Sequence, residues 1–445
     1  MHEGHEITSG QAQARRTIQE SVVCVTGLGY VGLPLAYEFD RVGHDVIGFD
    51  VDPEKVEQLR SGIDPTGDVG DAEIADATIE FTTDELAIGD ADFVLVAVPT
   101  PIDEMKNPNL DYVQSAGETI GRHIEAGTTV VLESTVYPGA TREIFAPAVE
   151  DASGLTYGEE FFVGYSPERM VPGDEEHGLR NVVKIVSGQN EEVLEDVATL
   201  YERIVDAGVH RAPEIEIAEM AKVVENTQRD LNIALVNELA VAAENLGIDG
   251  RAVLEAAGTK WNFHDYRPGL VGGHCIPVDP FFMVYQSERN GYSPKLVQQA
   301  REINEYMPKH VGELALKTMN DCGIVPKAST VLVLGLAYKP GVADVRTSAI
   351  GGTIDYLEEY GVDVVGFDPH ADDDVMREEF GIEIQEQLSF EGVDGIVLAT
   401  PHDRFLGIDY KSAAIEMGEQ SFLLDVDAVM DESELAEYGF EYRRL

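Results

Sequence analysis

Cysteine is scarce in this sequence, with three residues among 445. So few thiols exclude a disulfide-stabilised secreted scaffold and favour a reducing compartment. Long apolar stretches are also missing, because no run approaches the roughly 18 apolar residues that a membrane-spanning helix needs. Residues 1–20 are polar and lack the apolar core of a secretory signal. We therefore expect a soluble, cytoplasmic protein with no membrane partner, in which residues 1–20 form a disordered or variable tail.

Basic residues are the second shortage: 31 Lys and Arg stand against 83 Asp and Glu, a formal net charge of -52. This balance excludes a general basic surface for nucleic acid. The acidic residues are spread over every segment and 44% of all residues are hydrophobic, so the composition is that of a folded protein. Such an acidic surface suits molar salt, which screens charges within about 3 Å. We therefore predict a halophilic source.

Short apolar runs alternate with helical patterns through the first 214 residues. Residues 21–26 form an apolar run that ends at Gly27, and residues 45–50 form a second run that ends in Asp50. Alternating strands and helices predict a parallel sheet covered on both faces. Further strand-like runs occupy residues 93–98, 128–132, 161–164 and 182–186.

A long helix and a second sheet follow. Apolar residues recur at helical spacing from Ile217 to Leu246, and a helix of this length extends about 45 Å. A third section begins near Val325 and repeats the plan of the first, with runs at residues 331–334, 362–368, 395–399 and 422–426. We predict an α/β fold in which two Rossmann-like, doubly wound parallel sheets are joined by a long central helix and a helical middle domain, with domains at 21–214, 215–320 and 321–445.

The segment Gly27-Leu28-Gly29-Tyr30-Val31-Gly32 is a full G-x-G-x-x-G motif directly after a strand. Its glycines permit a tight turn and a close approach to a pyrophosphate at the N-terminus of the next helix. Asp50 would accept hydrogen bonds from the adenosine ribose and repel a 2′-phosphate, which favours NAD over NADP. A glycine turn without a ligand is the alternative. Lys55 either reaches the same ribose or phosphates or lies on a solvated helix face.

The segment Gly272-Gly273-His274-Cys275 precedes Asp279-Pro280, which predicts a helix start with Asp279 as the N-cap. The positive end of a helix dipole favours a thiolate nearby, whereas the alternative is a buried cysteine in a glycine turn. On the long helix, Lys222 and Asn226 lie one turn apart on one face. A partly buried amine there could assist proton removal or hold a developing alkoxide; an exposed lysine is the alternative.

Two more strand ends and one loop carry polar groups. Glu133-Ser134-Thr135 and Ser166-Pro167-Glu168-Arg169 place hydroxyls and carboxylates where ligand clefts form in α/β proteins. In the third section, the loop after Gly335 carries Lys339 and Arg346, which either meet a diphosphate or are ordinary surface charges.

These motifs, together with Val98-Pro99-Thr100-Pro101, resemble those of the UDP-glucose/GDP-mannose dehydrogenases, which are NAD-dependent four-electron oxidases of nucleotide sugars. The resemblance extends from Val22 to about Val426. It implies an NAD-binding domain at 21–214, a dimerisation domain with the catalytic cysteine at 215–320, and a UDP-sugar-binding domain at 321–445. A homodimer and no metal are implied.

The resemblance also implies roles for individual residues. Cys275 would form a thiohemiacetal and then a thioester. Lys222, Asn226 and Asp279 would position water and stabilise oxyanion charge, while Glu168 would act as a base or orient water and Thr135 would assist. The implied cofactor contacts are Gly27, Gly29, Tyr30, Val31, Gly32, Asp50, Lys55, Pro99, Thr100 and Thr135; the implied substrate contacts are Glu168, Arg169, Lys222, Asn226, Lys260, Arg267, Gly272, Gly273, Lys339 and Arg346.

Within the family, Ala257-Gly258-Thr259-Lys260-Trp261-Asn262-Phe263 and the segment from Arg267 to Cys275 resemble the UDP-N-acetylhexosamine enzymes. Pro172 stands where UDP-glucose enzymes commonly carry a second glutamate, and Thr259-Lys260 replaces an arginine of those enzymes. Trp261 and Phe263 would form aromatic walls for an acetamido group, or are packing residues at a domain seam.

We therefore predict oxidation of carbon six of a UDP-N-acetylhexosamine to the uronic acid, for polysaccharide or glycoprotein glycan synthesis. The alternatives are a UDP-glucose 6-dehydrogenase, a two-electron dehydrogenase of the same fold without the covalent step, and a non-catalytic nucleotide-sugar sensor.

Overall fold

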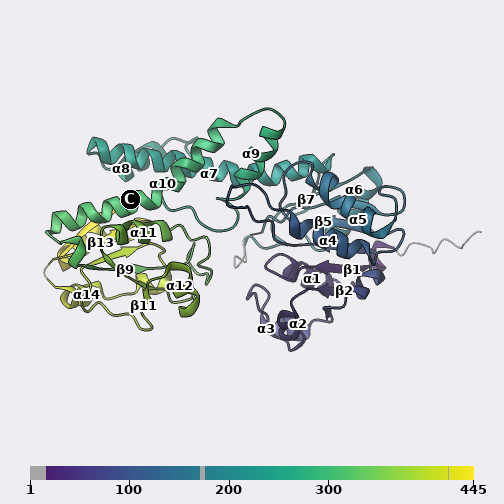
Figure 1. Cartoon of the computed structure of the whole chain (residues 1–445), viewed down its shortest axis with the longest axis horizontal. Coiled ribbons are helices and arrows are strands. Elements are labelled where there is room, and N and C mark those ends of the chain that lie inside the picture. Colours follow the sequence, from purple (N-terminus) through teal and green to yellow (C-terminus); the bar gives the residue numbers. More distant parts are fainter. Residues whose placement is uncertain (1–16, 171–175, 419) are drawn as a thin grey trace, which may run out of the picture. The chain divides into compact units, whose positions relative to one another are not determined.

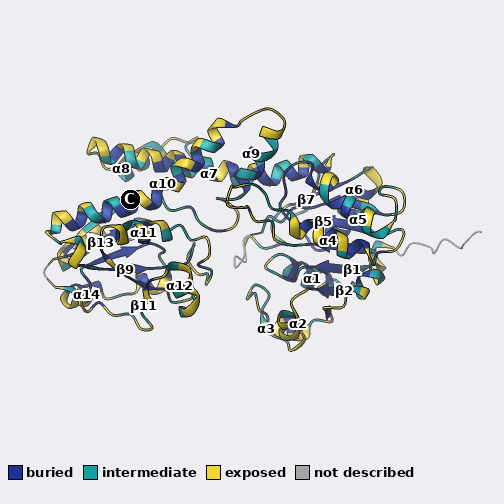
Figure 2. Ribbon diagram, in the orientation of Figure 1, coloured by how far each residue is buried: buried dark blue, intermediate teal, exposed yellow. Residues whose placement is uncertain are grey.

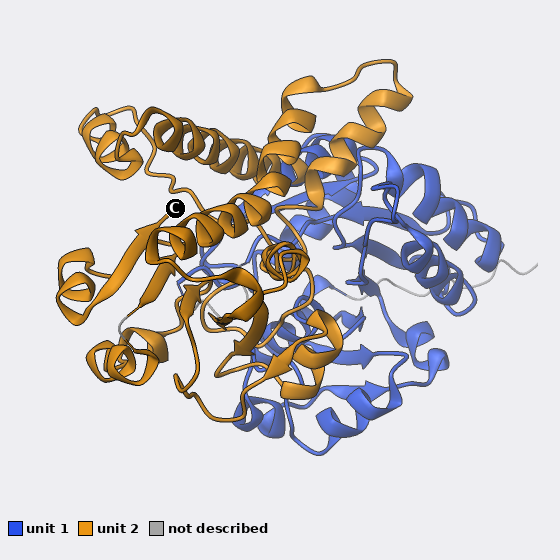
Figure 3. Cartoon of the chain, turned by 60° about the vertical axis from the view of Figure 1, so that its left-hand side comes forward, with its two compact units in different colours: residues 1–222 blue, residues 223–445 orange. Residues whose placement is uncertain are grey.

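The computed structural model describes residues 17–170, 176–418 and 420–445 (Figure 1). The chain forms two compact units, Met1–Lys222 and Val223–Leu445 (Figure 3). The border between them falls inside the long helix α7 (Ile215–Leu246). No helix in the described ranges is long and apolar enough to cross a membrane.

The predicted N-terminal tail is only partly covered by the structure. Residues 1–16 lie outside the described residues. Ile18–Glu20 form a short 3-10 turn, and Ile18 packs against the core of unit 1. Of the predicted disordered or variable tail, Ile18–Glu20 therefore form a defined turn, and the prediction for residues 1–16 falls outside the described residues.

Unit 1 contains an eight-stranded sheet with the order β3-β2-β1-β4-β5-β6-β7-β8. Its strands are β1 (Val22–Thr26), β2 (Asp45–Phe49), β3 (Glu80–Thr82), β4 (Phe93–Val96), β5 (Thr129–Leu132), β6 (Phe162–Tyr165), β7 (Lys184–Gly188) and β8 (Val209–Arg211). Neighbouring strands are parallel except β6 and β7, so the predicted parallel sheet contains one antiparallel pair. The described residues between these strands form no helix, and a parallel crossover usually needs one. As a result, β7 begins at the sheet edge where β5 and β6 end.

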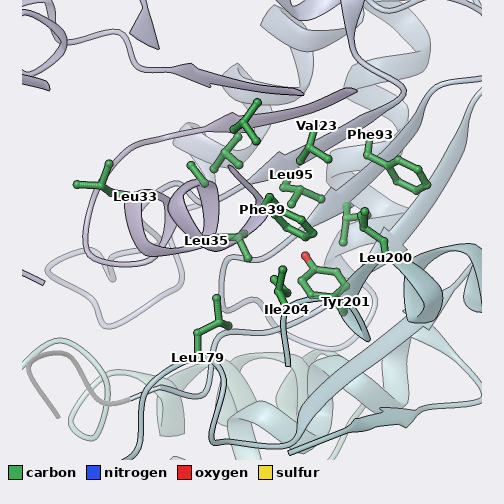
Figure 4. Close-up of a cluster of buried hydrophobic side chains, with 14 of the residues drawn as sticks. Val23, Leu33, Leu35, Phe39, Phe93, Leu95, Leu179, Leu200, Tyr201 and Ile204 are labelled. Atoms are coloured by element: carbon green, nitrogen blue, oxygen red, sulfur yellow. The ribbon is translucent and has the colours of Figure 1, made fainter. Parts of the chain in front are cut away.

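The core of unit 1 lies between this sheet and its helices. Strands β4 and β5 are buried along their whole length, as expected for strands covered on both faces (Figure 2). In the cluster of Figure 4, Val23 and Leu95 of the sheet belong to the same core as Phe39 and Tyr201 of two helices. The helices of unit 1 are α1 (Gly32–Arg41), α2 (Pro53–Arg60), α3 (Asp71–Asp76), α4 (Asp111–Gly121), α5 (Ala146–Ser153) and α6 (Glu191–Tyr201).

Unit 2 begins with the rest of α7 and contains α8 (Gly250–Gly258), α9 (Asp279–Arg289) and α10 (Lys295–Cys322). The predicted long helix is confirmed, and the regular elements described between residues 215 and 320 are all helices, with residues 259–278 forming a connection without helix or strand. A buried polar layer ties α7 to α10: Arg301 Nη1 lies 2.5 Å from Asp230 Oδ1, and Asn237 donates to Asn304.

The second sheet has six parallel strands with the order β11-β10-β9-β12-β13-β14. Two edge strands were not predicted, because one is only two residues long and the other carries several charged residues. The strands are β9 (Thr330–Leu334), β10 (Asp363–Phe367), β11 (Glu383–Ile384), β12 (Gly395–Leu398), β13 (Ser421–Asp425) and β14 (Phe440–Arg444); the helices are α11 (Gly351–Glu359), α12 (Asp373–Phe380), α13 (Asp403–Leu406), α14 (Tyr410–Met417) and α15 (Glu432–Tyr438).

The internal duplication predicted from the sequence is visible in both units. The order β3-β2-β1-β4-β5 corresponds to β11-β10-β9-β12-β13. Gly27 and Gly335 end the first strands with φ values of 91° and 87°. In each copy the next backbone N–H donates to the aspartate that follows the second strand, Asp50 or Asp368, over 2.8 Å.

Candidate active site

The glycine loop of unit 1 has the geometry of a phosphate cradle. A side chain at Gly27 would meet Ala97 O at 2.4 Å, and one at Gly32 would meet Gly27 O at 1.8 Å, so both positions require glycine. Gly29 has nothing within 4 Å of a Cβ position, which leaves room above the loop for a ligand. Helix α1 starts at Gly32, and no side chain caps its N-terminus. These residues therefore fit a dinucleotide pyrophosphate.

Asp50 and Lys55 form an ion pair at the end of β2. The Asp50 carboxylate is buried and accepts from Leu28 N and Lys55 Nζ, and its second oxygen accepts from Asp52 N. The structure thus places Lys55 beside the predicted ribose-binding carboxylate at 2.9 Å and not on a purely solvated face. Contact of either residue with a nucleotide stays a prediction.

In the second copy, the matching carboxylate is already fully engaged. Asp368 Oδ2 accepts from Leu336 N and Ala337 N and lies 3.0 Å from Nε2 of the buried His402. Gly341 N donates to His402 Nδ1, so Nε2 carries the proton of the neutral ring. Burial would raise the pKa of Asp368, but these donors outweigh it and hold the pKa well below its ordinary value. This carboxylate has no capacity for a ribose, which agrees with the missing glycine motif.

Several of the predicted residues of unit 1 lie at the carboxyl ends of adjacent strands. Pro99 and Thr100 follow β4, Thr135 follows β5, and Glu168 follows β6. Ser134 Oγ donates to Val98 O and accepts from Val98 N, and these bonds tie the first two strand ends together. The structure therefore brings the predicted cofactor and catalytic groups of this unit to one sheet edge.

A buried charge cluster lies directly behind Glu168. Lys184 Nζ is 2.6 Å from Glu133 Oε2, 3.3 Å from Glu168 Oε2 and 3.1 Å from Pro167 O. The Tyr201 hydroxyl donates to Glu133. Burial would raise the pKa of Glu168, but Lys184, two backbone N–H groups and Lys222 outweigh it and lower that pKa. Sequence reasoning missed Lys184; its only signal was a lysine at the start of an apolar strand.

The start of α7 is anchored to the loop after β5. Glu219, which is fully buried, accepts from Gly139 N at 2.5 Å and from Thr141 N at 2.9 Å. Burial raises the pKa of Glu219 to about 7 in spite of these donors. Lys222 follows almost one turn later and is only 9% exposed, which excludes the alternative of a solvated surface lysine.

In unit 2, the predicted cysteine stands before helix α9. Cys275 is exposed, and its carbonyl accepts from Val278 N and Asp279 N in the first turn. The exposure excludes the alternative of a buried structural thiol. The N-cap prediction is wrong: Val278 is the N-cap and Asp279 is the first helical residue. The Asp279 carboxylate instead accepts from Asn226 Nδ2 at 2.6 Å, which joins two predicted catalytic residues.

The glycines before Cys275 pack against the loop that carries Lys339 and Arg346. Gly273 N donates to Thr347 O, and a side chain at Gly273 would meet the Tyr338 ring at 2.9 Å. His274 and Arg346 both contact Asp344. Burial would raise the pKa of Asp344, but hydrogen bonds from His274 and Arg346 hold it far below its ordinary value. Two predicted substrate-binding segments of unit 2 are therefore adjacent.

The remaining predicted substrate residues of unit 2 lie elsewhere. Lys260 is exposed and Trp261 is 91% exposed, so Trp261 is not a packing residue within the single chain, and its role as an aromatic wall stays a prediction. Arg267 is exposed and lines a cavity of about 480 Å³ together with Phe263 and Arg444. The described residues that line this cavity do not include Cys275. Pro172 lies outside the described residues, and no group of three metal-ligating side chains occurs among those described.

Comparison with known proteins shows a family likeness over most of the chain. Three models of the UDP-glucose/GDP-mannose dehydrogenase family match it: the NAD binding domain at residues 21–205, the central domain at 216–306 and the UDP binding domain at 332–432. A UDP-N-acetyl-D-glucosamine 6-dehydrogenase of Pseudomonas aeruginosa is 43% identical over 411 residues, which are 92% of this chain and 97% of that protein.

Two solved structures are similar over their whole length. That of a UDP-D-ManNAc dehydrogenase from Pyrococcus horikoshii has a TM-score of 0.85 and 29% identity, and the match covers 95% of this chain and 98% of the other. That of a UDP-glucose dehydrogenase from Pyrobaculum islandicum has a TM-score of 0.83 and 28% identity, with 97% and 99% covered. The sugars named for these relatives differ.

Proposed function

The chain belongs to the UDP-glucose/GDP-mannose dehydrogenase family, and on that premise we propose that it oxidises carbon six of a UDP-N-acetylhexosamine to the uronic acid. It is an NAD-dependent nucleotide sugar dehydrogenase. The observation that carries the proposal is the pair of assembled sites: a dinucleotide cradle in unit 1, and in unit 2 an exposed thiol beside the Asn226–Asp279 hydrogen bond.

The chemistry has two oxidation stages. NAD, when bound, supplies the hydride acceptor for each stage, so two NAD are consumed for each acid. In the first stage the C6 alcohol loses a proton and a hydride and becomes an aldehyde. The Cys275 thiolate then attacks the aldehyde carbon, so that a C–S bond forms as the C=O π bond breaks, and protonation of the oxygen gives a thiohemiacetal. In the second stage this adduct loses a proton and a hydride and becomes a thioester. Water then breaks the C–S bond and releases the acid and the thiol. Sulfur suits this sequence because it is both a good nucleophile and a fair leaving group.

The other residues act on charge and water. The ammonium of Lys222 and the amide of Asn226 stabilise the alkoxide that forms at carbon six, because donors aimed at a developing charge lower the barrier. Asp279 holds the Asn226 amide in place. Glu168, whose pKa is lowered, is ionised at neutral pH and serves mainly as the acceptor that orients the hydrolytic water. Lys339 and Arg346 provide cations for the diphosphate.

The preference for an acetamido sugar rests on the relatives and on the loop that precedes Cys275. The P. aeruginosa protein named for UDP-N-acetyl-D-glucosamine is 43% identical. The loop with Lys260 and Trp261 presents a polar and an aromatic side chain that the single chain leaves exposed. UDP-glucose is the second candidate, supported by the structural likeness to the P. islandicum enzyme.

A homodimer is part of the proposal. Val224, Leu235, Leu239 and Leu246 are each more than 40% exposed and recur at helical spacing along one stripe of α7. An apolar stripe of this length on one helix suits burial against a second copy. Light scattering in molar salt should give twice the chain mass, and Leu239→Glu should reduce it to the chain mass.

A substrate panel tests the proposed function. Purified protein, NAD and either UDP-glucose or the N-acetylated gluco, galacto and manno sugars are compared by kcat/KM, read at the nicotinamide absorbance. We expect at least one acetamido sugar to exceed UDP-glucose by about tenfold or more, as expected when a site loses partners for a polar group. Higher kcat/KM for UDP-glucose would overturn the substrate assignment but not the reaction.

A further inference from the structure

The charge cluster behind Glu168 is built from three strand ends and one helix of unit 1. Glu133 follows β5, Glu168 follows β6, Lys184 is the first residue of β7, and Tyr201 is the last residue of α6. Because β7 is antiparallel to β6, its first residue lies at the edge where the parallel strands end. The reversal of one strand therefore delivers a cation to the candidate catalytic edge.

The ammonium of Lys184 has all three of its donors engaged. Its acceptors are Glu133 Oε2, Pro167 O and Glu168 Oε2, and its side chain is 2% exposed. A buried ammonium that makes only two carboxylate contacts and one carbonyl contact has no spare capacity for a substrate. Lys184 therefore cannot contact the reacting sugar while the cluster is intact.

The Glu168 carboxylate is held on both oxygens. Oε2 faces Lys184, whereas Oε1 accepts from Arg169 N and Met170 N at 2.6 Å each. The side chain is 12% exposed, compared with none for Glu133. Of the two carboxylates that share Lys184, Glu168 is thus the one that solvent or substrate can reach.

From this geometry, and resting on the role proposed for Glu168, we propose that Lys184 is a positioning residue that fixes the orientation of the Glu168 carboxylate and keeps it ionised, while Glu133 competes for the same ammonium. Four titratable groups face Glu168 or its partners: Lys184 from β7, Glu133 from the end of β5, Lys222 from α7 and Tyr201 from α6. Two of them are cations and only one is a carboxylate, so the ionised state of Glu168 prevails.

Removal of Lys184 and removal of Glu133 should have different effects on the pKa of Glu168. An opposite charge within hydrogen-bond distance lowers a carboxyl pKa by about one to three units. Removal of the cation in Lys184→Met should therefore raise the pKa of Glu168. The pH profile of kcat should then show a new acid limb, that is, a fall of kcat toward low pH as Glu168 becomes protonated. This limb should lie about one pH unit or more above any acid limb of the unaltered enzyme. Removal of the competing carboxylate in Glu133→Gln should produce no such limb.

The double variant Glu133→Gln with Lys184→Met is the matched control, because it keeps the net charge of the cluster at one negative charge. It also removes the Glu133 carboxylate, which in Lys184→Met would be buried without a cation and could prevent folding. The acid limb of the double variant should lie at a pH between those of the unaltered enzyme and Lys184→Met. Lys184→Arg restores the cation and should therefore show no new acid limb, even if it lowers kcat at every pH.

The experiment measures kcat from pH 5 to 9 for these variants with saturating NAD and UDP-sugar, after thermal melts confirm folding. The pH at which kcat falls on the acid side should be highest for Lys184→Met and next highest for the double variant. It should be lowest for the unaltered enzyme and for Glu133→Gln. An equal loss of kcat at every pH in Lys184→Met and in the double variant would overturn the proposal. Full kcat in Glu168→Gln would instead show that the proposed role of Glu168 is wrong, which separates the two failures.

Discussion

The Asp50 carboxylate accepts hydrogen bonds both from the glycine loop and from Lys55. Asp50→Asn keeps an acceptor for Leu28 N but removes the negative charge that repels a 2′-phosphate, and it frees Lys55 to meet that phosphate. We expect the ratio of kcat/KM for NADP to that for NAD to rise about tenfold or more, the scale of one charge-assisted hydrogen bond.

Steady-state kinetics with both cofactors measure this ratio. The control is Asp50→Asn with Lys55→Met, which should lose most of the gain for NADP. A preference of the unaltered enzyme for NADP would contradict the role given to Asp50.

Glu219 should make stability depend on pH. Its folded pKa is raised to about 7, so the folded state binds a proton that the unfolded chain releases above its ordinary pKa. The contribution of Glu219 to the free energy of unfolding is fully present below the ordinary glutamate pKa. It is lost as the pH rises through about 7, and the loss is on the order of 3 kcal/mol. Glu219→Gln should flatten urea-derived stability between pH 5 and 8, and an unchanged slope would contradict the assignment.

Individual site residues were predictable where a motif fixes them. The glycine turn at Gly27 and Gly32, the burial of Lys222 and the exposure of Cys275 agree with the functional interpretation of the sequence, while the roles of these residues stay predictions. Lys184 was not predictable, because its partners come from distant strand ends and only the antiparallel pairing of β7 brings them together. Long-range pairs of this kind leave no local sequence pattern.

A buried ion pair between Arg301 and Asp230 joins the helices α7 and α10. Arg301→Met leaves the Asp230 carboxylate buried without its cation and should cost about 3 to 5 kcal/mol. The double variant with Asp230→Asn should recover much of this loss. Chemical denaturation of the single and double variants measures it; equal stability of all three proteins would show that the pair contributes nothing.

At the scale of elements, long periodic segments were predicted better than edges. The helix α7 and the strands β1, β2, β4 and β5 lie within a few residues of their predicted bounds. The edge strands β3, β8, β11 and β14 and the direction of β7 were missed, since a short or charged edge strand lacks the apolar pattern of a central one.

The whole molecule carries a formal charge of -52, and self-repulsion at this charge opposes both folding and dimer formation. Molar salt shortens the screening length to about 3 Å and should therefore stabilise the protein. Circular dichroism melts in low and molar potassium chloride should show a Tm at least 10 °C higher in salt, roughly the effect of a few kcal/mol. Equal Tm values would contradict the halophilic prediction.

We propose a four-electron oxidation through Cys275, and the stoichiometry of NADH to sugar acid is its most direct test. With the preferred UDP-sugar limiting, we expect two NADH for each uronic acid, measured by absorbance and by mass spectrometry of the product. Cys275→Ser should release no acid under the same conditions, since an alkoxide is a poorer leaving group than a thiolate. One NADH per product, or normal acid release by Cys275→Ser, would contradict oxidation through a Cys275 thioester.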